Sequence, residues 1–164
     1  MSDPRAASLA TLDRTDRRIL DLLQRDGSLS NLELADRIGL SPSPCSRRVK
    51  ALQDSGVIEG YRAYVSARKL GLNLLAMIHI SMDKHTPDRF EAFERTVDAC
   101  PEVLECYLIT GQQADYMLKV IVRDMEDFQQ LLLGTITRIE GVSGVHSSFV
   151  MRRVVDRSAL PVDI

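Results

Sequence analysis

Three stretches in the first third of the chain repeat apolar residues every three or four positions, as amphipathic helices do. The pattern predicts helices over 13–27, 30–39 and 41–54. The first begins at Asp13, a good N-cap residue with another acid, Asp16, in the following turn. Their predicted buried stripes are Ile19, Leu22 and Leu23; Leu32, Ala35 and Ile38; and Cys45, Val49 and Leu52.

The boundaries of the second and third helices carry recognisable signals. Ser30 and Glu33 form a capping box, in which each side chain accepts from the other residue's backbone N–H. Gly39 suits the left-handed conformation that ends a helix. Ser41 is the predicted N-cap of the third helix and should accept from the N–H of Ser43. Two helices joined by such a tight turn indicate a helix-turn-helix.

The rest of the chain has a different rhythm. Residues 56–65 mix glycine with β-branched and aromatic residues, which predicts a short strand or wing. Residues 66–71 are typical of a linker. The remaining pattern predicts strands over 74–82, 103–110, 116–122 and 145–155, and helices over 87–99 and 125–139. This order predicts an α+β, ferredoxin-like βαββαβ sandwich with an antiparallel sheet.

The third helix carries the candidate DNA-binding chemistry. Ser43, Ser46, Arg47 and Lys50 lie roughly opposite its apolar stripe. Short hydroxyl side chains allow close approach to a major groove, while Arg and Lys reach phosphates or guanine edges. A solvated basic face on a helical bundle is the alternative, but the caps and the glycine turn favour a recognition helix. The predicted DNA-binding residues are Ser41, Ser43, Pro44, Ser46, Arg47, Arg48, Lys50 and Arg62.

Composition and charge narrow the class of protein. The 164 residues carry a net charge of −2, but the first 70 sum to +3 and the remainder to −5, so the first part suits a polyanionic partner. No apolar run approaches the ~20 residues of a membrane span. The N-terminus shows no secretory h-region, and three widely spaced cysteines fit a reducing cytoplasm.

No catalytic or cofactor motif emerges. The sequence has no phosphate-binding glycine loop and no metal-ligand spacing, and neither a metal nor a cofactor is expected. Its histidines, His79, His85 and His146, are far apart in sequence. We expect His79 to be packed on a strand or at an interface, and His85 to be a surface residue in a turn.

The stretch GLSPSPC over 39–45, followed by the basic helix, is highly specific. With Leu12–Leu20, Ser30–Ala35, Arg47–Val49 and Gly56–Ile58, it resembles the Lrp/AsnC (feast/famine) transcriptional regulators over nearly the whole chain. The resemblance implies a winged helix-turn-helix domain over 1–65, a linker over 66–71 and an effector-binding and oligomerisation domain over 72–164. It also implies dimers that assemble into tetramers or octamers, and control by amino acids.

The resemblance also implies an effector site. In this family a G-x-x-D-Y turn lies between dimers and lines the amino-acid site; here the turn is G-x-x-x-D-Y, one residue longer. Val145 replaces a hydroxyl residue common in the family, which favours an apolar pocket and an aliphatic effector. The implied effector-binding residues are Thr110, Gly111, Gln113, Asp115, Tyr116 and Ser147.

The predicted function is therefore a sequence-specific DNA-binding regulator of amino-acid metabolism genes that responds to an amino acid. Both faces of strand 74–82 are substantially apolar, so a second subunit should cover the face that the helices leave free. An architectural DNA-binding protein without effector is the alternative. A haem-pathway decarboxylase related to the family is a third, disfavoured by the basic third helix and the absence of clustered histidines.

Overall fold

The computed structural model describes residues 12–111 and 114–162, which divide into two compact units. One unit comprises the chain up to Tyr64 together with the residues from Val155 onward, and the other is Val65–Val154. The sequence had assigned residues 155–164 to the second domain. The described part of this segment differs from that assignment because Leu160 and Val162 contact the first unit.

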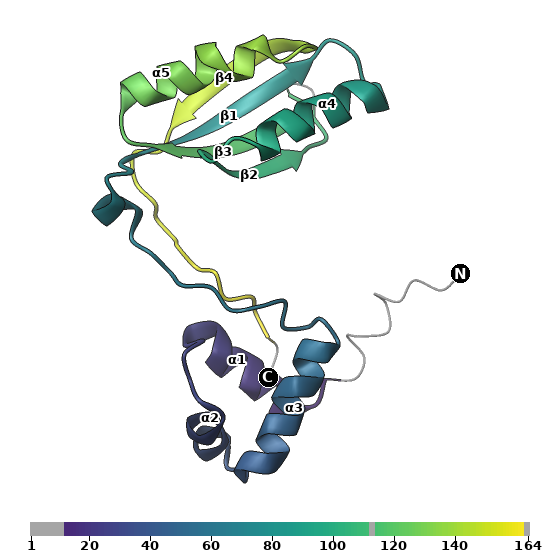
Figure 1. Cartoon of the computed structure of the whole chain (residues 1–164), viewed down its shortest axis with the longest axis vertical. Coiled ribbons are helices and arrows are strands. Elements are labelled where there is room, and N and C mark those ends of the chain that lie inside the picture. The colour runs from purple at the N-terminus through teal and green to yellow at the C-terminus, as the bar shows by residue number, and fades with distance from the viewer. Residues whose placement is uncertain (1–11, 112–113, 163–164) are drawn as a thin grey trace. The chain divides into compact units, whose positions relative to one another are not determined.

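Three helices build the N-terminal unit: α1 (Arg14–Arg25), α2 (Asn31–Ile38) and α3 (Pro42–Asp54), drawn in purple to blue in Figure 1. The predicted stripe of α2 was wrong at Leu32, which is 67% exposed. Leu34 is buried instead, because it shares a helix face with Ala35 and Ile38. The core of this unit consists of Ile19, Leu20, Leu34, Ala35, Ile38, Cys45, Val49 and Leu52.

The helix caps follow the predicted signals with one exception. The Ser30–Glu33 capping box forms in both directions, and Asp13 caps α1 in the same way with Asp16. Gly39 ends α2 with φ of 73°, a left-handed conformation that costs glycine nothing. Ser41 precedes α3 but makes no side-chain cap hydrogen bond, so the predicted bond to the N–H of Ser43 is absent.

The second unit has the predicted βαββαβ order. Its elements are β1 (Leu74–Met82), α4 (Pro87–Asp98), β2 (Val103–Leu108), β3 (Tyr116–Val122), α5 (Met125–Gly134) and β4 (Val142–Phe149). The four strands form one antiparallel sheet in the order β2-β3-β1-β4. The α+β fold class is therefore confirmed, with α4 and α5 on one face of the sheet (Figure 1).

Several predicted boundaries in this unit were wrong. The helix predicted over 125–139 ends at Gly134, and a 3-10 turn over Ile136–Arg138 follows it. The last strand begins at Val142 rather than 145 and ends at Phe149 rather than 155. A strand extends only where it pairs with a neighbouring strand. β4 pairs with β1 from Met82↔Val142 to Ala76↔Phe149, and this pairing sets both of its ends.

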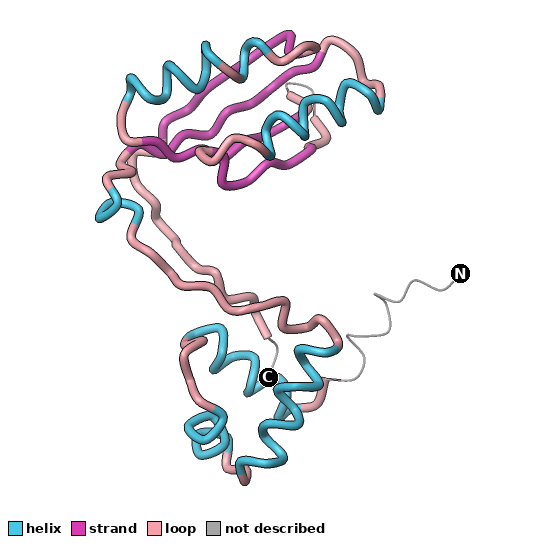
Figure 2. Tube along the Cα trace, viewed as in Figure 1, coloured by secondary structure: helices cyan, strands magenta, loops and turns pink. Residues whose placement is uncertain are grey.

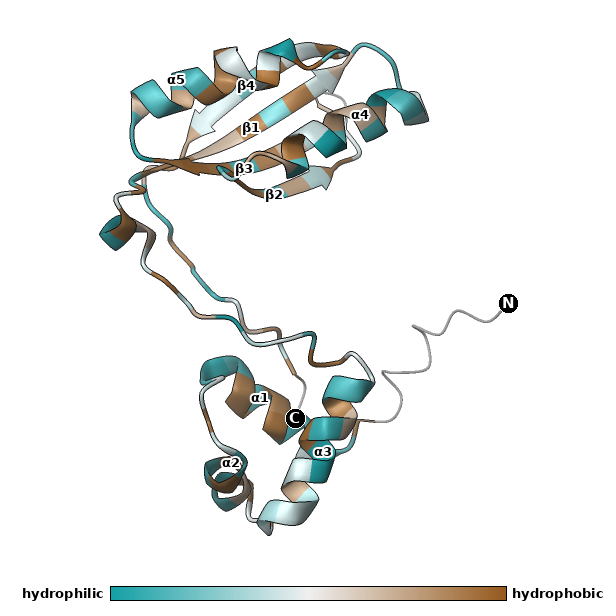
Figure 3. Cartoon of the chain, in the orientation of Figure 1, coloured by the Kyte–Doolittle hydropathy of each residue, from teal (hydrophilic) through white to brown (hydrophobic). Residues whose placement is uncertain are grey.

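Successive side chains of the central strands point to opposite faces of the sheet. Ala76, Ile78 and Ile80 of β1 are fully buried under the helices, with Phe93 of α4 and Phe128 of α5. Figure 3 shows hydrophobic residues along both central strands, β1 and β3. On the opposite face, the intervening residues of β1 are only partly buried: Leu75, Met77, His79 and Ser81. This second, half-buried face is the one that the sequence expected a partner to cover.

Of the two predicted alternatives for residues 56–65, a short strand or a wing, the strand does not form, and Figure 2 draws these residues as loop. Residues 59–65 are all exposed, and none of them is in a strand. A 3-10 turn over Ala67–Leu70 lies inside the predicted linker. Among the described residues, no helix has both the length and the hydropathy to cross a membrane.

Candidate DNA interface and effector turn

The open face of α3 carries the chemistry that the sequence predicted. Ser43, Ser46, Arg47 and Lys50 are all exposed, while Cys45, Val49 and Leu52 anchor the other side of the helix. Within the described residues, Arg47 and Lys50 have no ion-pair partner, so both cations are available to an anionic ligand. The first turn of α3 holds no acidic residue, which leaves its positive helix end uncompensated.

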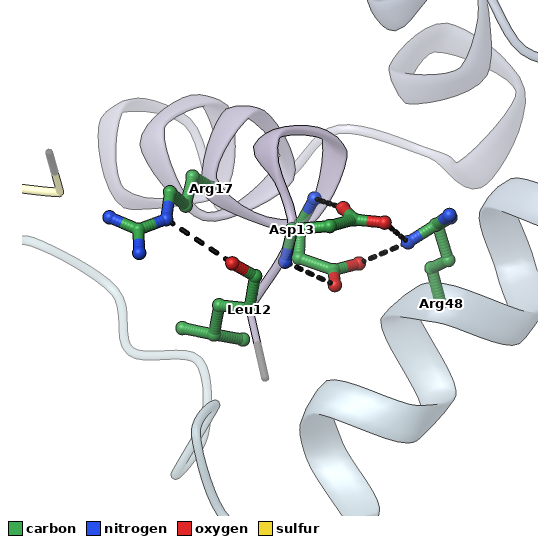
Figure 4. Close-up of polar contacts among 5 residues, drawn as sticks. Leu12, Asp13, Arg17 and Arg48 are labelled. Atoms are coloured by element: carbon green, nitrogen blue, oxygen red, sulfur yellow. Dashed lines mark hydrogen bonds and ion pairs between the residues drawn. The ribbon is translucent and has the colours of Figure 1, made fainter. Parts of the chain in front are cut away.

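Arg48 lies outside this open face, and its predicted contact with DNA stays a prediction. It lies three residues after Cys45 and four before Leu52, on the flank of the buried stripe. Its Nη1 donates to Asp13 Oδ2 at 2.7 Å and to Asp16 Oδ1 at 2.8 Å (Figure 4). The guanidinium therefore clips α3 to the start of α1.

The electrostatics of this clip agree with its geometry. A backbone hydrogen bond from Asp16, together with the Arg48 guanidinium, holds the pKa of Asp13 below its ordinary value of 3.8. Hydrogen bonds to the two carboxylates raise the pKa of Arg48. Both acids also lie at the N-terminus of α1, where the helix dipole stabilises negative charge.

Sequence reasoning missed a second contributor to the open face, Asn31. It lies at the first position of α2, and its Nδ2 is 3.5 Å from Ser46 Oγ on α3. Asn31, Ser46 and Lys50 line one hollow of about 630 Å³, with Tyr61 at its margin. The capping box could have indicated this residue, because it places Asn31 at the first position of α2, directly after the N-cap Ser30.

The other predicted DNA-binding residues are positioned less distinctively. Ser41 is exposed in the turn between α2 and α3, and Pro44 is partly buried in the first turn of α3. Arg62 is exposed in the irregular segment that follows α3.

The candidate effector turn is tied to the rest of its unit through Asp115. One carboxylate oxygen, Oδ2, accepts the Met82 N–H at 2.7 Å, and Oδ1 lies 2.8 Å from His85 Nε2. The Asp115 N–H also donates to Ile80 O at 2.8 Å. Asp115 thus joins the end of β1 to the start of β3, and one of its carboxylate oxygens already pairs with the His85 imidazole.

Tyr116 belongs to the core of its unit. It is 1% exposed, meets Phe90 edge-to-face and packs at a tilt against Phe93, and it donates its hydroxyl hydrogen to Glu94 Oε1 at 2.7 Å. Burial and the neighbouring Glu94 carboxylate raise the pKa of Tyr116 well above its ordinary value of 10.0. The hydroxyl therefore stays protonated at physiological pH and keeps its hydrogen bond to Glu94.

One chain does not bring all the predicted effector residues together. Thr110 and Gly111 are exposed in the turn beside Asp115, and Gln113 lies outside the described residues. Ser147 is on β4, paired with Ile78, whereas Tyr116 is on β3 and paired with Ile80. β1 separates these strands, so about 10 Å lies between them across the sheet.

The histidines occupy two environments. His79 of β1 lies directly opposite His146 of β4 on the sheet face away from the helices, and His85 is in the turn before α4, paired with Asp115. Among the described residues, no three His, Cys, Asp or Glu side chains are grouped so as to hold a metal ion.

Comparison with known families matches both units. A model of winged helix-turn-helix DNA-binding domains matches residues 12–59, and a model of the Lrp/AsnC ligand binding domain matches residues 75–160. The leucine-responsive regulatory protein of Escherichia coli strain K12 is 41% identical over 151 residues, which are 92% of each chain. That of Salmonella typhimurium gives the same values.

Solved structures agree over almost the full length. A transcriptional regulator of Neisseria meningitidis, crystallised as an L-Met complex, has a TM-score of 0.90 and 41% identity. The match covers 93% of this chain and 98% of that one. An AsnC family regulator of Agrobacterium tumefaciens has a TM-score of 0.88 and 33% identity, with the same coverage.

Proposed function

The chain belongs to the Lrp/AsnC family of effector-responsive, DNA-binding transcriptional regulators, and from this premise we propose how its residues divide the work. The N-terminal unit reads DNA through α3, and the C-terminal unit binds an amino acid and joins subunits. We propose genes of amino-acid metabolism as its targets, and the cytoplasm, where those genes lie, as its compartment.

DNA recognition begins with the unpaired cations of α3. Arg47 and Lys50 reach a base edge or a phosphate, and the short side chains of Ser43 and Ser46 let the helix enter a major groove. Asn31 adds a polar contact from the start of α2, which crosses the phosphate backbone in helix-turn-helix complexes. Arg48 contributes by fixing the angle between α1 and α3.

We assign the effector to the turn around Gly111 and Asp115, with Ser147 supplied across a contact between dimers. Among the described residues, Asp115 Oδ1 pairs with His85, whose side chain is 68% exposed. The ammonium group of an amino acid can take the place of this imidazole, while exposed N–H groups of the turn receive the carboxylate. The N. meningitidis regulator was solved with L-Met, and an apolar amino acid of this size is the effector class we propose.

Assembly follows from the uncovered sheet face. Leu75, Met77 and Met117 are half-buried there, and an apolar sheet face of this kind is stable when another subunit covers it. A homodimer built on this face presents two recognition helices to two half-sites, about one helical turn of DNA apart or a multiple of it. Contacts between dimers then give a tetramer or octamer.

The observation that carries the proposal is the pair of exposed, unpartnered cations on α3 of a helix-turn-helix. The test starts by sequencing the genomic DNA fragments that the protein retains, with and without an amino-acid pool. Affinity for a retained fragment is then measured for the parent, Arg47→Ala and Lys50→Ala. If both variants bind as the parent does, α3 is not at the interface.

Asp115→Ala tests the effector assignment separately. It should retain DNA affinity. Its calorimetric binding free energy for L-methionine or L-leucine should weaken by ~2–5 kcal/mol if the contact is direct and desolvated. Binding equal to that of the parent would exclude Asp115 from the site. If no amino acid raises the melting temperature of the parent, an architectural DNA-binding role replaces effector control.

A further inference from the structure

The last described residues of the chain return to the N-terminal unit. β4 ends at Phe149, the second unit ends at Val154, and the residues from Val155 onward group with the helix-turn-helix. The chain therefore passes between the units twice, after Tyr64 and after Val154. Residues 155–162 have no role in the division of work between the recognition helix and the effector turn.

Gln24 of α1 holds this tail by two hydrogen bonds. Its Nε2 donates to Leu160 O at 3.1 Å, and its Oε1 accepts from Leu160 N at 2.6 Å. A carboxamide offers the same donor and acceptor as a peptide group, so Gln24 binds the backbone of Leu160 as a neighbouring strand would. Gln24 therefore contacts only the backbone N–H and C=O of Leu160 in these two bonds.

Two further contacts fasten the same segment. Val162 packs against the apolar core of the N-terminal unit, which includes Ile19 and Leu20 of α1. Nearer the second unit, the hydroxyl of Tyr64 donates to Asp156 Oδ2 at 2.5 Å. This bond joins the last residue of the N-terminal unit before the chain leaves it, Tyr64, to the second residue after the chain returns, Asp156.

We propose that residues 155–162 form a strap that transmits the state of the effector unit to the DNA-binding unit. This inference rests on the function proposed above. Ser147, an assigned effector residue, lies on β4, and the chain runs from β4 directly into the strap. The strap docks on α1, which shares its core with α3, the recognition helix. A shift of β4 therefore reaches the DNA-binding unit through a second covalent path, in addition to the connection after Tyr64.

The test compares full-length Gln24→Ala with Gln129→Ala. Gln129 is exposed on α5 of the other unit, so its replacement makes the same chemical change on a helix surface without removing a contact to residues 155–162 that the structure shows. Hydrogen exchange at the Leu160 amide reports docking. It should speed up about 25-fold in Gln24→Ala, because two ordinary hydrogen bonds are lost and each accounts for about fivefold, and it should stay at the parent rate in Gln129→Ala. Val162→Ser provides a second undocking variant that acts through packing.

Coupling is read from the ratio of DNA affinities with and without saturating L-methionine or L-leucine. In Gln24→Ala and Val162→Ser this ratio should fall toward one, while calorimetric binding of the amino acid stays at the parent value. A parent-like ratio in a variant whose strap has undocked overturns the proposal, as does unchanged exchange at Leu160 in both variants. If the parent protein binds DNA equally well with and without the amino acid, the result contradicts the proposed function itself, and with it the coupling role.

Discussion

Replacing Arg48 with alanine should destabilise the N-terminal unit and leave DNA affinity almost unchanged. The guanidinium makes two hydrogen bonds, to Asp13 at 2.7 Å and to Asp16 at 2.8 Å. Such bonds are strong when buried, but the Arg48 side chain is 36% exposed, and solvent screening reduces their value. The two acids left behind remain at the N-terminus of α1, where the helix dipole favours them. We therefore expect a loss of about 1 kcal/mol.

Hydrogen exchange at the amides of α1 and α3 is the direct assay, because it reports the stability of this unit separately from the other. A loss of about 1 kcal/mol increases the open population about fivefold, and exchange should speed up by the same factor. Arg47→Ala is the matched control on the same helix. It should leave exchange unchanged and weaken DNA binding, by ~1–3 kcal/mol if Arg47 contacts a base edge.

The effect of Arg48 also depends on pH in a defined direction. The pKa of Asp13 lies below its ordinary value of 3.8 in the folded protein. Its contribution to stability is therefore fully present above about pH 4 and disappears as the pH falls through the lower, folded-state pKa. The difference between parent and Arg48→Ala should be constant near neutrality and shrink in acid.

The result that would refute this reasoning is specific. If Arg48→Ala weakens DNA binding as much as Arg47→Ala does, with no change in exchange, Arg48 leaves its carboxylates to bind DNA. The clip between α1 and α3 would then contribute nothing to the stability of the unit.

Three other variants test separate features. Ser30→Ala removes the cap of α2 and should cost about 1 kcal/mol, seen as a lower midpoint in urea unfolding followed by circular dichroism, with no change expected if the cap is idle. Tyr116→Phe deletes the bond to Glu94 inside a packed core; it should lower thermal stability by about 1 kcal/mol, and an equal or higher Tm would contradict a stabilising bond. Met77→Lys places a charge on the uncovered sheet face and should reduce the molar mass seen by light scattering; an unchanged mass would move the dimer interface elsewhere.

Local signals in the sequence determined most elements of this protein. The capping box at Ser30, the left-handed Gly39 and the β-rich runs at 74–82 and 116–122 act within a few residues of themselves. A helix cap or an apolar strand needs little distant information, so the helix-turn-helix and the order of strands and helices were predictable. The sequence by itself also identified the basic, open face of α3.

Only the tertiary structure decided which partners the charged and terminal residues take. Arg48 follows Arg47 directly, but three-dimensional packing turns it to Asp13 and Asp16, which are more than thirty residues away in the chain. Asp115 finds His85 and the end of β1, and Leu160 finds Gln24 across 136 positions. Hydrogen bonds and ion pairs require a specific distance and direction between two groups, and no periodicity along one segment encodes that for groups brought together by the fold.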